Sequence, residues 1–372
     1  MGAVTGCVRS CPLAGSNAWL GAFGLAVHNV LVLPKLRPGD KVAIVSPSFA
    51  APGAFPEVHR QAMRRIRNTL GLIPVEYPTT ARVGATAKDR AADLNSAFAD
   101  PEIKAVFATV GGNDQITVIP YLDPDVLTVP KPFLGYSDNT NLLNWLWSHG
   151  ANGFYGGSTQ VHLGAGPYID DIHLRSLRAA LFDGGTLELT DPGVSEDFGF
   201  DWADPLALTQ VGIREPTESW IWAGAENTAR GKTWGGCLEV IDQILVAGRG
   251  PTPEALGGTI LLVETAEDSP SADYVLRILR AMGEAGLLSQ IAGVLCARPP
   301  ASSFRNRPDT AERLAYRQEQ AETIINVVTT YNPKAAISIG VPFGHTRPQW
   351  VVPYGGIVTI EPNTEKVFAE YR

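Results

Sequence analysis

Short apolar runs alternate with stretches of helical spacing in the first half of the chain. Residues 41–45 and 105–110 are compact apolar runs bounded by turn residues, which is typical of buried strands. Residues 56–70 and 89–98 carry apolar side chains three and four positions apart, the spacing of one helix face. This alternation predicts β-α-β units, so the fold class is expected to be α/β, with an N-terminal parallel sheet of the Rossmann or flavodoxin type.

A strand and a helix follow each other without a loop later in this half. Residues 132–136 are predicted as a strand, and the segment 138–147 carries Leu142, Leu146 and Trp147 on one helical stripe. Residues 135–139 therefore join a strand directly to a helix.

The pattern weakens at residues 167–205, where Gly, Asp and Pro cluster, and restarts afterwards. We predict a linker there, between an N-terminal domain at 34–166 and a smaller C-terminal α/β domain at 206–372. The second domain is predicted to contain strands at 259–264 and 291–297, a strand ending near 340, helices at 271–284 and 311–328, and a closing hairpin at 357–360 and 366–371.

Residues 1–33 are predicted to be an extension, disordered or misassigned, outside both domains. Residues 18–33 bear a weak likeness to a signal peptide, but polar residues such as His28 and Asn29 interrupt them. No apolar run reaches the roughly 18 residues that cross a bilayer, so membrane insertion is not expected.

Charge and cysteine usage narrow the function classes. The net charge is -8 and no block of Lys or Arg occurs, so a nucleic-acid partner is disfavoured. Four scattered cysteines are too few for a disulfide framework in 372 residues. We expect a cytoplasmic protein.

Ser137 is the most distinctive candidate residue, in the sequence Gly135-Tyr136-Ser137-Asp138 at the strand-to-helix turn. A tight turn exposes a serine hydroxyl, and the helix N-terminus offers free amides to a developing oxyanion. The alternative is that Ser137 only caps the helix. Gly111-Gly112 ends an earlier strand, where a backbone amide can approach a ligand closely, although an ordinary turn fits equally well.

A serine nucleophile needs a base, and the chain has six histidines. His345 follows a strand in a Gly- and Pro-rich loop, a common position for catalytic side chains, and His162 is the alternative. His59 and His173 lie in polar helical contexts and are predicted to be on the surface, while His149 is predicted to end the helix after Ser137.

Glu264 ends a buried strand, so its carboxylate is expected at the sheet edge where ligands bind. A carboxylate there could hold an imidazole in its productive tautomer. Glu267 and Asp268 are close competitors for this role.

Other chemistry has weaker support in the sequence. Metal-ligand motifs are missing, and so is the GxGxxG phosphate fingerprint, so neither a metal nor a dinucleotide cofactor is expected. Trp220, Trp222 and Trp234 fall within fifteen residues, which fits a stacking wall for a planar group or simply core packing.

Taken in order, these motifs resemble the LD-carboxypeptidases, a family of serine peptidases, from about residue 34 to the end. The resemblance rests on Gly111-Gly112, Gly135-Tyr136-Ser137-Asp138, Gly235-Gly236-Cys237-Leu238, Leu262-Val263-Glu264, Ala297-Arg298-Pro299 and Gly344-His345. It implies a triad of Ser137, Glu264 and His345, with the amides of Gly112 and Asp138 as the oxyanion hole. It also implies two α/β domains with the triad at their interface, and a homodimer.

The activity that the resemblance implies is cleavage of an amide bond next to a free carboxylate. The segment from Glu264 to Ser271 is more similar to the microcin C immunity branch than to the murein tetrapeptide branch, which acts on peptidoglycan. The expected partner is a small peptide or an aminoacyl-nucleotide-like molecule, with Trp220, Trp222, Arg298 and Arg347 as candidate substrate-binding residues. The alternatives are a non-catalytic α/β binding protein and an enzyme of nucleotide or sugar phosphates.

Overall fold

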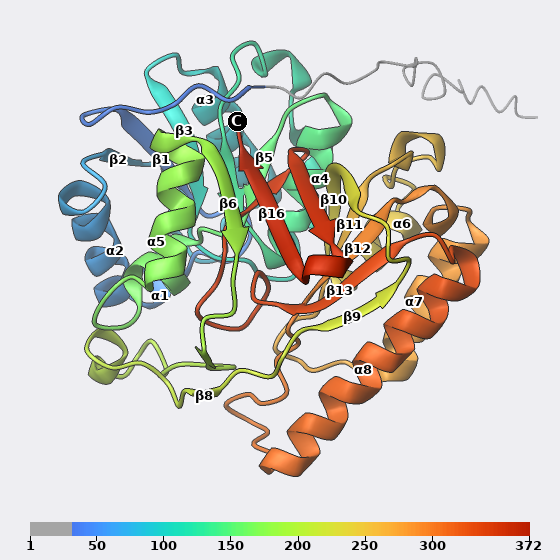
Figure 1. Cartoon of the computed structure of the whole chain (residues 1–372). Helices are drawn as coiled ribbons and strands as arrows, with labels where there is room; N and C mark the ends of the chain where they lie inside the picture. Colours follow the sequence, from blue (N-terminus) through green and yellow to red (C-terminus); the bar gives the residue numbers. More distant parts are fainter. Residues whose placement is uncertain (1–31) are drawn as a thin grey trace, which may run out of the picture.

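The computed structural model describes residues 32–372, so most of the predicted extension at 1–33 lies outside the described residues (Figure 1). Leu33 is already buried, and its amide donates a hydrogen bond to the carbonyl of Arg372 at 3.3 Å. Within residues 32–372, no helix is long and apolar enough to cross a membrane.

The first sheet has six strands in the order β14-β5-β4-β3-β1-β2. Its strands are β1 (Lys41–Val45), β2 (Ile73–Glu76), β3 (Ile103–Ala108), β4 (Phe133–Gly135), β5 (Gly153–Tyr155) and β14 (Val352–Tyr354). All pairs are parallel except β14 with β5. Its helices are α1 (Ala51–Ala54), α2 (Pro56–Asn68), α3 (Ala87–Ala99) and α4 (Thr140–Ser148). The apolar run of β1 is buried, as expected for a parallel strand covered by helices.

The second sheet has eight strands in the order β6-β16-β15-β10-β11-β12-β13-β9. Its strands are β6 (Gly185–Leu189), β9 (Ile221–Gly224), β10 (Ala229–Cys237), β11 (Ile260–Glu264), β12 (Gly293–Ala297), β13 (Ala336–Val341), β15 (Ile357–Glu361) and β16 (Lys366–Tyr371). The strands from β10 to β13 are parallel, and antiparallel strands extend both edges. The predicted closing hairpin is the β15–β16 pair. The mixed α/β fold class is confirmed.

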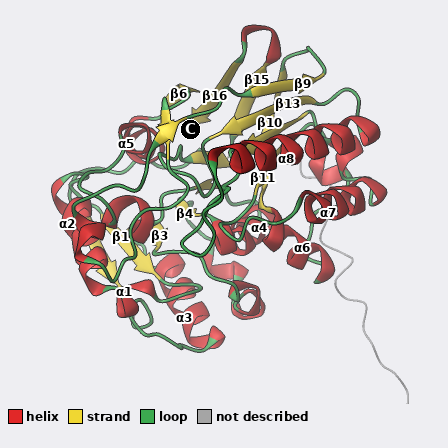
Figure 2. Cartoon of the chain, turned by 90° about the horizontal axis from the view of Figure 1, so that it is seen from below, coloured by secondary structure: helices red, strands yellow, loops and turns green. Residues whose placement is uncertain are grey.

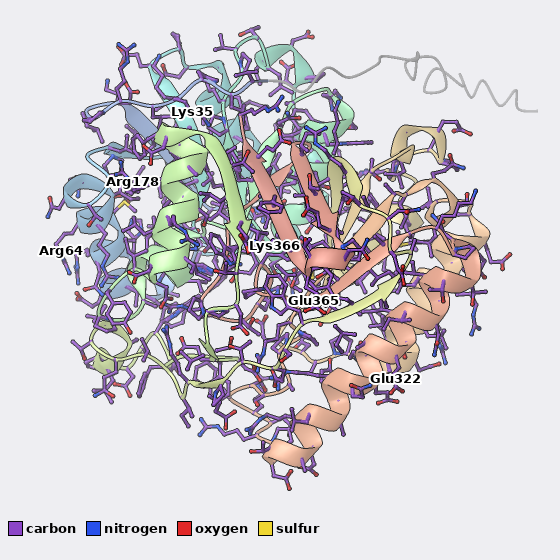
Figure 3. All side chains as sticks on the ribbon, viewed as in Figure 1. Lys35, Arg64, Arg178, Glu322, Glu365 and Lys366 are labelled. Carbon is purple, nitrogen blue, oxygen red and sulfur yellow. The ribbon has the colours of Figure 1, made fainter. Side chains whose placement is uncertain are left out.

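Helices α6 (Leu238–Val246), α7 (Ala272–Glu284) and α8 (Thr310–Tyr331) belong to this second half, and α7 and α8 lie side by side (Figures 1 and 2). A capping box starts α8: the Asp309 side chain accepts from the Glu312 amide, and the Glu312 side chain accepts from the Asp309 amide. The side chains of Arg64 and Glu322 project outward from the surface (Figure 3).

The segment predicted as a linker, 167–205, contains regular structure. It holds α5 (Asp171–Arg178), β6 of the second sheet, and β7 (Val194–Ser195), which pairs with β8 (Glu215–Pro216). The Gly, Asp and Pro clusters stand between these short elements, which is why the hydrophobic periodicity is interrupted without the structure ending.

The two sheets share one hydrophobic core. Tyr155 and Tyr354 from the first sheet pack in the same cluster as Trp234 from the second, all at most 1% exposed. In addition, β14 comes from the C-terminal part of the chain but completes the first sheet. The two halves are therefore packed against each other through this shared core. The candidate site lies where their strand ends meet.

Candidate functional site

Ser137 lies between β4 and α4 with a φ angle of 63°. A left-handed backbone costs a residue with a side chain about 1 to 3 kcal/mol, and such strain clusters at functional sites. No side-chain cap hydrogen bond starts the turn at Ser137 or α4 itself. The geometry thus matches a nucleophile elbow better than a helix cap.

Gly111 packs directly against this turn. A β-carbon on Gly111 would lie 2.8 Å from the Ser137 β-carbon and 2.9 Å from its Oγ, so a larger residue would displace the serine. The Asp138 carboxylate accepts from Ser48 Oγ at 2.5 Å and from the Gln115 amide at 2.9 Å. Burial raises the pKa of Asp138 more than these hydrogen bonds lower it. Gly111 and the serine turn are thus in close contact, and Gly111, Gly112 and Ser137 line the same pocket.

Glu264 and His345 form a close pair at the carboxyl ends of β11 and β13. The Glu264 Oε2 atom lies 2.6 Å from His345 Nδ1, and neither side chain is more than 8% exposed. Burial lowers the pKa of His345, but Glu264 and two further carboxylates outweigh it and raise the pKa to about 9. At Gly344 a β-carbon would come within 2.7 Å of Glu264 Oε2, so a glycine lets this loop pass over the carboxylate.

Tyr155 connects the glutamate to the serine turn. Its hydroxyl donates to Glu264 Oε1 at 2.5 Å and accepts from the Ser137 amide at 3.2 Å. Burial raises the pKa of Tyr155 well above its usual value, so the hydroxyl keeps its proton. Tyr155 is not among the site residues predicted from the sequence, where its one signal is a hydroxyl-bearing residue at the end of a short apolar run.

The three candidates for the acid that orients His345, namely Glu264, Glu267 and Asp268, lie in different positions. Glu264 faces Nδ1 of His345, whereas Glu267 Oε2 lies 3.4 Å from Nε2 and its side chain is 63% exposed. Asp268 lines the pocket without an ion pair to this histidine among the described residues. Ser137 Oγ and His345 Nε2 share the pocket but are not hydrogen-bonded to each other in the described chain.

The pocket in front of Ser137 and His345 has a volume of about 710 Å³. Much of its outer wall is aromatic and comes from loops: Phe49, Phe55, Phe198, Phe200, Trp202 and Phe304. Trp220 and Trp222 lie at or before β9 and do not line it, and Trp234 is buried with its Nε1 donating to Asn144 at 3.0 Å. The structure brings Trp202 to the pocket in place of the predicted tryptophans, because the long loop after β7 folds back over the site.

The two candidate arginines are both in ion-pair clusters. Arg347 lines the pocket, and its Nη2 lies 3.0 Å from Asp170 Oδ2. Arg298 lies outside the pocket, buried against Asp197 at 2.6 Å and Glu218 at 2.7 Å. Only Arg347 of these two is therefore placed to meet a substrate.

The predictions for the other histidines gave mixed results. His59 is 6% exposed and His173 is 1% exposed, so the prediction of surface positions was wrong. Their polar sequence neighbours concealed the fact that both residues face inward from amphipathic helices. His162 lines the pocket, but its Nε2 lies 2.8 Å from the Gln349 side chain, and burial lowers its pKa well below 6.5. His149 ends α4 as predicted.

No group of three or more His, Cys, Asp or Glu side chains that could hold a metal ion occurs within residues 32–372. Cys237 and Cys296 are free and buried.

Two family profiles match the chain: the LD-carboxypeptidase N-terminal domain over residues 42–156 and the C-terminal domain over residues 230–360. The chain belongs to the LD-carboxypeptidase family. Membership supports a serine carboxypeptidase-type hydrolase. The resemblance found in the sequence motifs is confirmed.

Relatives and solved structures agree with this family. A Vibrio cholerae protein whose name assigns it to the carboxypeptidases is 25% identical over 347 residues, 91% of this chain and 98% of its own length. A similarly named Streptomyces coelicolor protein is 28% identical, covering 90% of this chain and 94% of its own. The microcin C7 self-immunity protein MccF of Escherichia coli is 29% identical over 50% of this chain and 53% of its own.

The structure of MccF in complex with glutamyl sulfamoyl guanosine shows the same fold, with a TM-score of 0.78 at 20% identity. This likeness covers 92% of the present chain and 99% of the MccF chain. The MccF-like protein from Streptococcus pneumoniae, solved in complex with AMP, has a TM-score of 0.77 at 21% identity, over 90% of this chain and 99% of that chain.

Proposed function

We propose that this protein is a serine hydrolase that cleaves an amide bond next to a free carboxylate, with Ser137 as nucleophile, His345 as base and Glu264 as its orienting acid. The observation that carries this proposal is the buried Glu264–His345 pair at 2.6 Å, whose His345 lines one pocket together with a strained serine at a strand-to-helix turn. Along the chain the nucleophile Ser137 comes first, the orienting Glu264 second and the base His345 last.

The reaction begins when neutral His345 accepts the Ser137 proton at Nε2 and the serine oxygen attacks the carbonyl carbon. Glu264 stabilises the imidazolium that forms. The amides of Gly112 and Asp138 bind the oxyanion, each contributing on the order of 3 kcal/mol to the transition state. The Ser137 amide already donates a hydrogen bond to the Tyr155 hydroxyl, so it is not one of these donors.

Collapse of the tetrahedral intermediate breaks the carbon–nitrogen bond, and His345 gives its proton to the leaving amine. Water then attacks the acyl-enzyme, with His345 again as base, and releases the acid and free Ser137. General-base catalysis of this kind contributes roughly 10² to 10⁴ in rate.

The substrate is an aminoacyl-nucleotide-like molecule in this proposal. The aromatic wall around Trp202 supports it, because planar bases stack on aromatic side chains. MccF has been solved with glutamyl sulfamoyl guanosine and with aspartyl sulfamoyl adenosine, which supports the same substrate class here. Arg347, the one Lys or Arg of the described chain that lines the pocket, is the proposed partner of the substrate carboxylate.

The test compares wild type and Ser137→Ala on aspartyl-sulfamoyl adenosine and on a murein tetrapeptide ending in D-Ala. We expect wild type to cleave the nucleotide analogue and the variant to be inactive. Preference for the tetrapeptide would move the protein to the murein branch, and equal activity of the variant would refute the serine mechanism. The homodimer and the cytoplasmic location stay predictions.

A further inference from the structure

The imidazole of His345 lies between two carboxylates, one buried and one exposed to solvent. Glu264, with a side chain that is 0% exposed, meets Nδ1 at 2.6 Å, whereas Glu267, at 63% exposed, meets Nε2 at 3.4 Å. Nδ1 is the nitrogen that an orienting acid holds in a triad. Nε2 is the nitrogen that has to take the serine proton, so Glu267 contacts the nitrogen through which Ser137 has to react.

Glu267 can contact Nε2 of His345 and can also move away from it. It sits in a turn closed by a hydrogen bond from the Ser269 amide to the Ala266 carbonyl at 3.2 Å, and the Ala266 amide is fixed by Glu239 Oε1 at 2.9 Å. The backbone is thus anchored while the Glu267 side chain reaches into solvent and lines the pocket. A rotamer change moves its carboxylate away at little cost, because exposed ion pairs are weak.

We propose that Glu267 is a positioning residue that holds Nε2 of His345 in a protonated resting state, and that its carboxylate moves off this nitrogen before His345 can accept the Ser137 proton. This inference rests on the proposed function. An imidazolium has no lone pair to accept a proton, so the Glu267 contact opposes catalysis at neutral pH.

The surroundings of His345 favour the same charge state. The charged or titratable groups that face it come from several elements: Glu264 on β11, Glu267 in the turn after β11, Glu239 on α6, Tyr136 with its ring 5.0 Å away, and His162 in the adjoining π-turn. Burial lowers the pKa of His345, and the three glutamates together raise it to about 9. Glu267 is the exposed member of these three, so it can be altered without disturbing the buried Glu264 or the half-buried Glu239.

Glu267→Gln keeps the shape of the side chain and removes its charge. We expect the pKa of His345 to fall by roughly half a unit to one unit, the size expected for a pair with one exposed partner. The value of kcat/KM near pH 7 should then rise about three- to ten-fold. The value that kcat/KM reaches at high pH, where His345 is neutral in both proteins, should stay unchanged.

The first test is NMR titration of histidine-labelled wild type, Glu267→Gln and Asp268→Asn, with the His345 signal assigned through His345→Gln. Asp268 is the matched control, since it is the next acid in the same turn and has no ion pair with His345 in the described structure. A downward shift of the His345 titration in Glu267→Gln alone supports the proposal. Identical titrations in wild type and Glu267→Gln would overturn it.

This titration does not depend on catalytic activity, so its result can be distinguished from a failure of the proposed serine mechanism. The second test is the pH profile of kcat/KM for the same proteins and for Glu267→Asp, which should restore part of the wild-type limb. A uniform loss of kcat/KM in Glu267→Gln, with an unmoved limb, would contradict the proposal and make Glu267 a substrate-binding residue.

Discussion

The inner and the outer parts of the candidate site are built in different ways. The inner part consists of Ser137, Tyr155, Glu264 and His345, which lie at the ends of strands and are joined by hydrogen bonds of 2.5 to 3.2 Å. The outer part consists of loops that carry aromatic rings and exposed acids. The inner geometry is thus set by strand ends and by hydrogen bonds, including the one that fixes the His345 loop to Glu264, while the outer loops determine which molecules enter.

The largest effect should come from the inner part. Glu264→Gln leaves the carboxyl shape but no longer stabilises an imidazolium or fixes its tautomer, so kcat should fall by about 10³ to 10⁴. The kcat of His345→Asn should fall at least as far. Steady-state kinetics on either substrate measure this loss, and a fall of less than ten-fold in both variants would remove the pair from the mechanism.

Removing the hydroxyl of Tyr155 should have an intermediate effect. In Tyr155→Phe, the buried Glu264 Oε1 and the partly buried Ser137 amide both lose their partner. Leaving such groups unpaired costs about 1 to 3 kcal/mol, so we expect a lower unfolding free energy and a kcat reduced roughly ten-fold or more.

Tyr371→Phe is the matched control for that variant. Tyr371 is equally buried and donates one hydrogen bond, to the Val351 carbonyl at 2.7 Å, and has none with the serine turn. Urea unfolding and kcat are measured for both. If the two variants lose stability alike but neither loses kcat, Tyr155 has only a structural role.

The outer part should affect substrate binding more than chemistry. Trp202 lines the pocket and packs edge-on against Phe55 with ring centroids 5.5 Å apart. Stacking of a base on one aromatic ring is worth about 1 to 3 kcal/mol, so Trp202→Ala should raise KM for a nucleotide substrate roughly ten-fold with little change in kcat. Trp222→Ala, outside the pocket, should leave KM unchanged; equal effects of both substitutions would contradict the assignment.

The last effect concerns stability and not turnover, and it comes from His173, which packs against His162. Burial lowers the pKa of His173 to about 4, so the folded protein keeps it neutral while the unfolded chain binds a proton below about pH 6.5. The unfolding free energy should therefore decrease as the pH falls from 6.5 toward 4, by about 2 kcal/mol at pH 5. Urea unfolding at pH 7 and pH 5 should show this loss in wild type and a smaller one in His173→Asn.

The sequence predicted most of the inner part and little of the outer part. Strand positions such as β1 and the turn at Ser137 follow from local patterns, because hydrophobic periodicity and turn residues act over a few positions. Tyr155 was missed because its two partners, Ser137 and Glu264, are far from it in the chain and come from both halves.

Local patterns could not decide whether Trp220 and Trp222 form a stacking wall or pack in the core, for the same reason. Trp220 and Trp222 lie close to one another in sequence, but the path of the loop at 193–217 decides which aromatic residues reach the pocket. That path depends on long-range ion pairs, such as Arg214 with Asp170 at 2.6 Å, which local patterns do not contain. The inward orientation of His59 and His173 likewise depends on tertiary packing.

The central claim is that Ser137 is an activated nucleophile, and covalent labelling tests it most directly. Wild type and Ser137→Ala are treated with a fluorophosphonate probe at pH 9, and the adduct is located by mass spectrometry of the intact protein and its peptides. We predict one adduct, on Ser137, in wild type and none in the variant. Labelling of the variant at the wild-type rate, with the adduct on another residue, would contradict the account.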